Sequence, residues 1–154
     1  MKSYDVVALG GTFDIIHNGH IELLNKAFSI SHKTIIGLTS DELAIRKGKD
    51  LVKNYEQRLA SLKSVIEKNF PKSSYEVSKL ENDFGPAVIE GNVQVLVVSK
   101  ETRNKGLLLN ELRAKRNLPS VEIVVVPMVL AEDGNPISTT RIKNSEIDNK
   151  GNLN

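Results

Sequence analysis

GGTFDIIHNGH, residues 10–20, directly follows the first apolar run of the chain. Gly10 and Gly11 allow a sharp turn and a close approach of the backbone to a ligand, because no Cβ intervenes. The stretch then leads into a helical pattern, and the free N–H groups and partial positive charge of a helix N-terminus suit phosphate. The sequence therefore predicts a strand, a tight turn and a helix N-terminus arranged around phosphate.

Two histidines stand three residues apart in this stretch. If the helix begins near His17, this spacing puts His17 and His20 on one face. Two imidazoles there could donate hydrogen bonds to phosphate oxygens and to charge that develops in a transition state. Two other interpretations stay open: an ordinary turn that Asp14 caps through its side chain, and half of a metal site. A metal site would need carboxylates, because the chain has only one other histidine and no cysteine.

Apolar segments of strand length alternate with segments of helical periodicity along the chain. Strands are expected at residues 5–9, 34–38, 75–80, 93–98 and 121–127. Helices are expected at residues 21–28, 55–70 and 107–116, and a last one begins near Ser138. This alternation predicts an α/β fold, a five-stranded parallel sheet with helices on both faces.

Four of the polar or glycine positions fall where a strand ends. Gly10, Thr39 and Ser99 follow the first, second and fourth strands, and Ser138 lies beyond the fifth. Ligands bind outside the carboxyl ends of the strands in such sheets, at the switch point of the strand order. These positions are therefore expected to converge on one site.

Composition limits the possible functions. At 154 residues the chain is expected to form one domain, residues 1–154, with a polar, frayed tail at 144–154. A net charge of +2 with mixed signs and 5% aromatic residues do not favour nucleic acid as a partner. No apolar run is long enough to span a membrane and no signal-peptide pattern is present, so a cytoplasmic location is expected.

The histidine stretch resembles the first signature of the nucleotidyltransferase superfamily, Gly-Thr-Phe-Asp followed by His-x-Gly-His, and ISTTRI at 137–142 resembles the second. Longer segments resemble phosphopantetheine adenylyltransferases of the archaeal and eukaryotic type: IGLTSDELA (36–44), YEQRLASL (55–62), FGPAVIE (84–90), VVSKET (97–102), NELRAKRNL (110–118) and VPMVLAEDGNPISTTRI (126–142). The resemblance covers nearly the whole chain and implies a Rossmann-like nucleotidyltransferase fold.

The implied reaction is transfer of AMP from ATP to 4′-phosphopantetheine, which gives dephospho-coenzyme A and pyrophosphate by direct in-line displacement. The nucleophile is a phosphate that is already ionised at pH 7, so positioning and charge stabilisation suffice. Mg²⁺ is expected to accompany ATP, held by phosphates rather than by a protein cage. The resemblance also implies a monomer, and the arm that the product shares with coenzyme A makes coenzyme A a candidate feedback ligand.

The resemblance assigns roles to individual residues. His20 and His17 contact the reacting phosphates, and Thr12 orients the attacking phosphate. The residues expected to hold ATP are these three together with Gly10, Gly11, Phe13, Ser138, Thr139, Thr140 and Arg141.

A mobile catalytic lysine is expected after the second strand, where the candidates are Lys47, Lys49 and Lys53. Lys49 is favoured and Lys47 comes next, both also as ligands of the acceptor. The bacterial enzymes carry an Arg-Gly-x-Arg run after the fourth strand, whereas this chain has SKETRNKG (99–106). Arg103 is the expected substitute, with Lys105 as a second candidate.

The following helix carries three cations, Arg113, Lys115 and Arg116, which are expected on a solvated face.

Two other functions remain open. One is a different nucleotidyltransferase, either a cytidylyltransferase or an adenylyltransferase for a flavin or nicotinamide mononucleotide. The other is a non-enzymatic nucleotide-binding module, which would have no need of groups that act only in a transition state.

Overall fold

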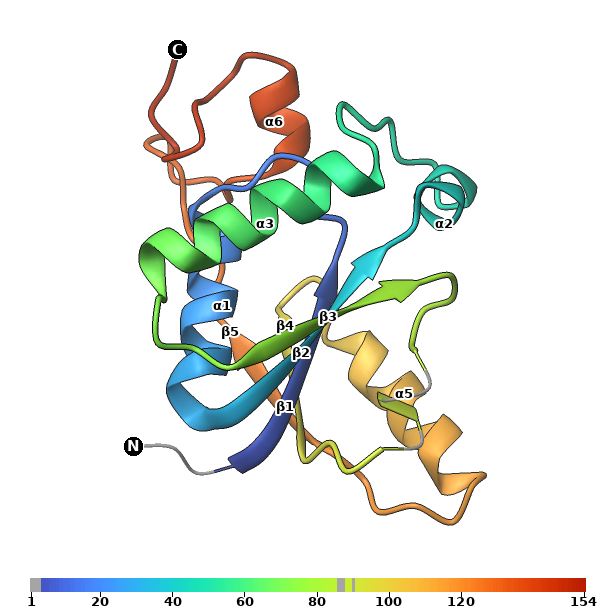
Figure 1. The fold of residues 1–154 in the computed structure, drawn as a ribbon. Helices are drawn as coiled ribbons and strands as arrows, with labels where there is room; N and C mark the ends of the chain where they lie inside the picture. The colour runs from blue at the N-terminus through green and yellow to red at the C-terminus, as the bar shows by residue number, and fades with distance from the viewer. Residues whose placement is uncertain (1–3, 86–87, 90) are drawn as a thin grey trace.

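A computed structural model describes residues 4–85, 88–89 and 91–154 (Figure 1). The strands are β1 (Tyr4–Gly11), β2 (Ser31–Thr39), β3 (Tyr75–Leu80), β4 (Val95–Ser99) and β5 (Glu122–Val126). The helices are α1 (Asn18–Ile30), α2 (Asp41–Arg46), α3 (Tyr55–Asn69), α5 (Asn104–Ala114) and α6 (Thr139–Lys143). None of the helices found in these ranges has the length and apolar composition needed to cross a membrane.

The five strands form one parallel sheet in the order β3-β2-β1-β4-β5. The chain moves outward from β1 to β3 and then returns to the other side of β1 at β4. The helices that follow β1 and β4, α1 and α5, therefore lie on opposite faces of the sheet, and this switch point of the strand order is where such sheets bind ligands. The predicted parallel sheet is confirmed.

Alternate residues of the strands face two separate layers of helices. Val7 and Leu9 of β1 pack in the cluster that includes side chains of α1 and α3, whereas Ala8 packs in the cluster that includes side chains of α5. Figure 1 shows α1 and α3 on one side of the sheet and α5 on the other. Residues 7–9 of β1 and 95–98 of β4 are buried on both faces of the sheet, which explains why these runs are continuously apolar. The edge strand β3 is more exposed and carries Glu76 and Lys79 on its surface.

Helix α2 was not expected from periodicity. It begins after Ser40, whose hydroxyl accepts the backbone N–H of Leu43 at 3.0 Å. Asp41 and Glu42 follow in the first turn, where negative charge favours a helix N-terminus. A serine followed by two acidic residues is an N-cap signal that the sequence does contain.

The expectation that Arg113 lies on a solvated face is wrong. Its side chain is 3% exposed and donates hydrogen bonds to the carbonyls of Pro119, Val88 and Gly91 at 2.8, 3.0 and 3.0 Å. It lies one helical turn after the buried Leu109, and its guanidinium supplies the donors that carbonyls in the segments before β4 and β5 would otherwise lack. Lys115 and Arg116 are exposed, as expected.

The tail at 144–154 is packed rather than frayed. Ile147 is buried in a small cluster with Ala131 and Ile137, and the N–H of Glu132 donates to the carbonyl of Gly151 at 2.7 Å. The tail also reaches the start of α1, where the N–H of Asn18 donates to the carbonyl of Asn149 at 3.2 Å. The polar composition of the tail gave no indication that Ile147 would anchor it in an apolar cluster.

Candidate active site

A cavity lies at the switch point, against the carboxyl ends of β1, β2 and β4. Gly10, Gly11, Thr39 and Ser99 all line it. The predicted convergence of the strand ends is therefore confirmed for the first, second and fourth strands. Ser138 is not one of the described residues that line this cavity.

The two histidines cap the start of α1 reciprocally. Nδ1 of His17 accepts the N–H of Gly19 at 3.0 Å, and Nδ1 of His20 accepts the N–H of His17 at 3.1 Å. The rings lie 4.0 Å apart between centroids, and the ring of His20 also contacts that of Phe13 at 4.9 Å. Each Nδ1 is an acceptor, so each neutral ring carries its proton on Nε2, on the side away from the helix backbone.

Both imidazoles are neutral at pH 7. Burial lowers the pKa of His17 to about 4. Burial and the neighbouring His17 together lower the pKa of His20 to about 3. The pair therefore presents two N–H donors without a fixed positive charge, an arrangement suited to phosphate oxygens that gain charge during a reaction.

These pKa values predict that the protein loses stability in acid. The unfolded chain takes up protons on His17 and His20 near their ordinary pKa of 6.5, and the folded chain does not. Between about pH 6.5 and 4 the free energy of unfolding should thus fall by about 1.4 kcal/mol per pH unit for each histidine that stays neutral in the folded chain, and so by up to about 2.7 kcal/mol per pH unit for the pair. Urea unfolding at several pH values measures the slope. It should flatten in a His17→Asn/His20→Asn variant and persist in His32→Asn, and equal slopes in all three would contradict the assigned pKa values.

Gly19 makes room for the His17 ring. A Cβ at this position would lie 2.7 Å from Cε1 and 2.9 Å from Nδ1 of His17. Gly19→Ala is therefore expected to displace the imidazole, cost about 1 kcal/mol of stability through the lost cap and lower kcat by about tenfold or more.

A double-mutant cycle separates this effect from a general helix effect. In a His17→Ala background the clash is gone, and Gly19→Ala should gain about 0.5–1 kcal/mol from helix propensity. Additive effects of the two changes, measured by urea unfolding, would contradict the role given to Gly19.

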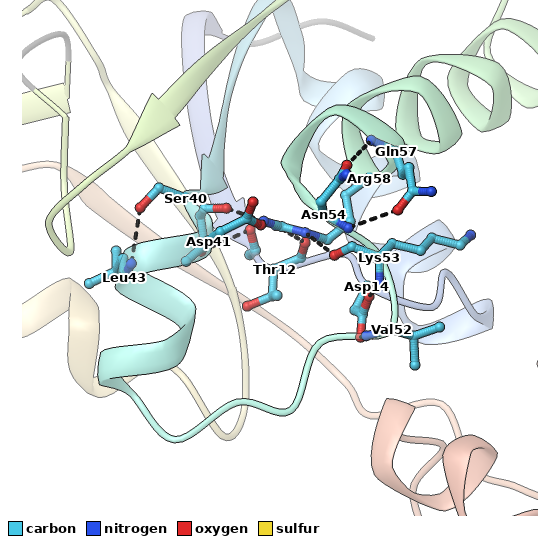
Figure 2. Close-up of polar contacts among 12 residues, drawn as sticks. Thr12, Asp14, Ser40, Asp41, Leu43, Val52, Lys53, Asn54, Gln57 and Arg58 are labelled. Atoms are coloured by element: carbon cyan, nitrogen blue, oxygen red, sulfur yellow. Dashed lines mark hydrogen bonds and ion pairs between the residues drawn. The ribbon is translucent and has the colours of Figure 1, made fainter.

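The buried side chain of Arg58 forms hydrogen bonds to four segments around the site. It is 0% exposed and donates to the carbonyls of Thr12 at 2.9 Å, Thr39 at 2.7 Å and Lys53 at 3.2 Å, and to Asp41 Oδ1 at 2.7 Å (Figure 2). The hydrogen bond from Arg58 is the main influence that holds the pKa of Asp41 below its usual range. One side chain thereby fixes the histidine turn, the end of β2, the start of α2 and the loop before α3.

Asp14 does not cap its own turn. It is 4% exposed, and its two oxygens accept the N–H groups of Val52 and Lys53, each at 2.9 Å (Figure 2). Lys143 of α6 lies 2.7 Å from Asp14 Oδ2. Burial acts to raise the pKa of Asp14, but the hydrogen bonds from Lys143, Val52 and Lys53 outweigh it and the pKa is lowered.

The lysines gather at one side of the cavity. Lys47 and Lys105 line it with Asp83, which pairs with Lys47, while Lys49 is exposed and is not one of the described lining residues. The pKa of Lys105 is lowered first by burial and then by the charge of Lys47, with a smaller contribution from Lys49. Three cations near one carboxylate leave an excess of positive charge at this side of the cavity. Lys53 is held through its backbone by Asp14 and Arg58.

The other expected ligands lie in three settings. Arg103 is exposed at the N-cap of α5, and it does not belong to the described lining residues. Phe13 is buried with φ 52°, and its ring packs where a Cβ on Gly11 would come within 3.0 Å. Arg141 forms ion pairs with Asp133 and Glu146, so its charge is neutralised by carboxylates of the C-terminal loops.

The C-terminal signature forms the start of α6. Ser138 Oγ accepts the N–H of Arg141 at 3.2 Å, which caps this short helix. Thr139 and Thr140 are the first two residues of α6.

Arg58, Asp14 and Lys143 were missed as residues that organise the site. Arg58 has a sequence signal, because it stands four and eight residues before the core residues Leu62 and Ile66 and so shares their helix face. Asp14 and Lys143 have no such signal, since their partners lie 38 or more residues away in the chain.

Comparisons with known proteins identify the family. A family model described as cytidylyltransferase-like matches residues 8–145. A phosphopantetheine adenylyltransferase of Methanosarcina acetivorans is 45% identical over 150 residues, which cover 96% of this chain and 94% of that protein. The phosphopantetheine adenylyltransferase of Methanothermobacter thermautotrophicus is 36% identical, with 99% and 91% covered. A solved structure described as a protein of unknown function from Archaeoglobus fulgidus has a TM-score of 0.72 at 31% identity and covers 82% of this chain and 89% of that chain. The family expected from the two signatures is confirmed.

Proposed function

This chain belongs to the phosphopantetheine adenylyltransferases, within the cytidylyltransferase-like family, and we propose that it transfers AMP from ATP to 4′-phosphopantetheine. The products are dephospho-coenzyme A and pyrophosphate. The chain is thus a nucleotidyltransferase, and the proposal concerns how its own residues serve that reaction.

The observation that carries the proposal is that the switch-point cavity has largely apolar walls and a cluster of lysines on one side. Its walls are largely apolar, with Leu43, Leu80 and Phe84 among them, and one side carries Lys47 and Lys105. An uncharged arm that ends in a phosphate matches such a cavity, because the arm needs apolar and backbone contact and its phosphate needs cations. The glycines at the end of β1 let the phosphate approach the backbone closely.

The nucleotide phosphates are proposed to lie between the two signatures. Nε2–H groups of His17 and His20 would donate to them from one side, and Ser138 to Thr140 would contact them from the other. The contact between Asn18 and Asn149 and the pair of Asp14 with Lys143 support this placement, because they hold the two segments side by side.

The reaction follows from these positions. An ionised oxygen of the acceptor phosphate attacks the α-phosphorus of ATP, a new P–O bond forms, and the bond from the α-phosphorus to the bridging oxygen breaks. Pyrophosphate leaves with the bond electrons, and no general base is required because the nucleophile carries no proton. His17 and His20 stabilise the charge that moves onto the phosphate oxygens, while Thr12 and Lys49 or Lys47 orient the acceptor.

Mg²⁺ is proposed to enter on the triphosphate. Within the described ranges no group of three or more His, Cys, Asp or Glu side chains is placed to hold a metal ion. Asp14, the carboxylate within the histidine motif, already binds Val52, Lys53 and Lys143. Phosphate oxygens would therefore hold the ion, which would supply charge neutralisation.

Lys105→Ala is expected to raise the KM for 4′-phosphopantetheine by about tenfold or more, because its ammonium lines the acceptor cavity beside Lys47. The KM for ATP should change by about twofold or less. Arg103→Ala is the matched control two residues away, and it should behave as wild type. Steady-state kinetics with each substrate varied in turn measures both constants. A larger effect at Arg103 than at Lys105 would contradict the placement of the acceptor phosphate.

A substrate panel tests the function against its alternatives. ATP and CTP are each offered with 4′-phosphopantetheine, flavin mononucleotide and nicotinamide mononucleotide, and pyrophosphate is measured. Turnover only with ATP and 4′-phosphopantetheine supports the proposal. Preference for CTP or another acceptor would reassign the substrate, and ATP binding without turnover would indicate a binding module.

A further inference from the structure

The loop between α2 and α3 carries the lysines expected at the acceptor phosphate, and its α3 end is held by one buried carboxylate. Asp14 accepts the N–H groups of both Val52 and Lys53 at 2.9 Å. This contact spans from the histidine turn after β1 to a segment that has no regular structure of its own. The loop position therefore depends on Asp14.

Lys143, the last residue of α6, adds a third segment to this junction. Its ammonium lies 2.7 Å from Asp14 Oδ2 and donates to the backbone carbonyl of Asp50. The side chains of Lys143 and Asp14 are 23% and 4% exposed. One ammonium thus binds the histidine turn and the loop at the same time. Lys143 belongs to α6, the helix that begins within the second signature.

Two backbone carbonyls of the loop are held by side chains from different parts of the chain. Arg58, itself part of α3, fixes the carbonyl of Lys53 at the α3 end. The carbonyl of Asp50 is held by Lys143 from another part of the chain. The N–H groups of Lys47 and Lys49 donate to the carbonyls of Leu43 and Ala44 of α2, so α2 holds the start of the loop and Lys143 of α6 holds it from Asp50 onward.

We propose that Lys143 is a positioning residue that couples the nucleotide segment at Ser138–Thr140 to the lysine-bearing loop at 47–54. The inference rests on the proposed function for the identity of both ligands. A nucleotide that orders α6 holds Lys143 on Asp14 and Asp50, and the fixed loop presents Lys47 and Lys49 to the acceptor phosphate. The coupling is reciprocal, so each substrate tightens the binding of the other.

The first test uses the wild-type protein and a non-hydrolysable ATP analogue. Amide hydrogen exchange of residues 47–54 is expected to slow by about tenfold when the analogue binds without acceptor. Unchanged exchange in this loop, with the analogue bound, would overturn the proposal. This measurement needs no turnover, so it remains decisive even if the acceptor is a different phosphate ester and the proposed function fails.

The second test compares Lys143→Met with Lys143→Arg, and with Lys150→Met as the exposed control from the same C-terminal region. Lys143→Met should raise the KM for 4′-phosphopantetheine by about tenfold and remove the effect of the analogue on loop exchange. Binding of the analogue alone should change by about threefold or less, and Lys143→Arg should restore the coupling. An acceptor KM equal to wild type in Lys143→Met would overturn the proposal, and if that variant does not fold, the wild-type exchange result decides.

Discussion

Replacing His20 by alanine is expected to lower kcat by about two to three orders of magnitude while ATP still binds within about threefold of wild type. The neutral ring offers its Nε2–H to phosphate oxygens, and the bond strengthens as charge moves onto them. Loss of that donor therefore costs more in the transition state than in the ground state. Single-turnover kinetics measures the chemical step, and titration with ATP measures binding.

The control for this prediction is His32→Ala, at an exposed position at the amino end of β2, the end of the sheet opposite to the histidine motif. His20→Ala also removes the acceptor for the N–H of His17, which should cost about 1 kcal/mol of stability and leave the protein folded. A kcat within about threefold of wild type would show that His20 serves the helix cap alone.

Replacing Arg58 by methionine is expected to lower the free energy of unfolding by about 3–5 kcal/mol. The carbonyls of Thr12 and Thr39 would lose their buried donor, and Asp41 would lose the partner that keeps its pKa low. Methionine fills a similar volume, so the loss reports the hydrogen bonds rather than a cavity. Urea unfolding at pH 7 measures the change.

Lys63→Met is the matched control, because Lys63 is exposed on the same helix, and its effect should stay within about 0.5 kcal/mol. Arg58→Lys should fall between the two, since one ammonium cannot reach acceptors on four segments. A loss below about 1 kcal/mol in Arg58→Met would contradict the role of Arg58 in holding the histidine turn and the loop together.

The strands and the long helices could be predicted from local pattern. The third strand lies at 75–80 as expected, and the helix predicted at 55–70 ends one residue earlier. Apolar runs and four-residue spacings predict these elements correctly because each pattern reflects the burial of a whole strand or helix face. The short α2 was missed because it is too brief to show such a period.

The hydrogen-bond partners of the buried charges could not be placed from local pattern. Arg58 and Arg113 stand on the same helix faces as the core residues Leu62 and Leu109, but the carbonyls that they satisfy explain why a charged side chain is buried there. Most of those carbonyls lie 19 or more residues away in the chain. The same holds for the tail, where Ile147 docks on a cluster formed by the loop after β5.

The candidate site divides in the same way. The geometry of the histidine motif was predictable because it is local: the helix start, the two rings and Gly19 lie within four residues. The proposed acceptor side depends on which cations the fold brings to the cavity. There the structure places Lys47 and Lys105, whereas the sequence favoured Lys49 and Arg103.

Mixing the purified protein with ATP, Mg²⁺ and 4′-phosphopantetheine, and following both pyrophosphate and dephospho-coenzyme A, tests the central claim most directly. The account predicts that the two products form in equal amounts, that both substrates are required, and that His20→Ala reduces both products equally. Pyrophosphate released from ATP alone, or no dephospho-coenzyme A while another acceptor reacts, would contradict it.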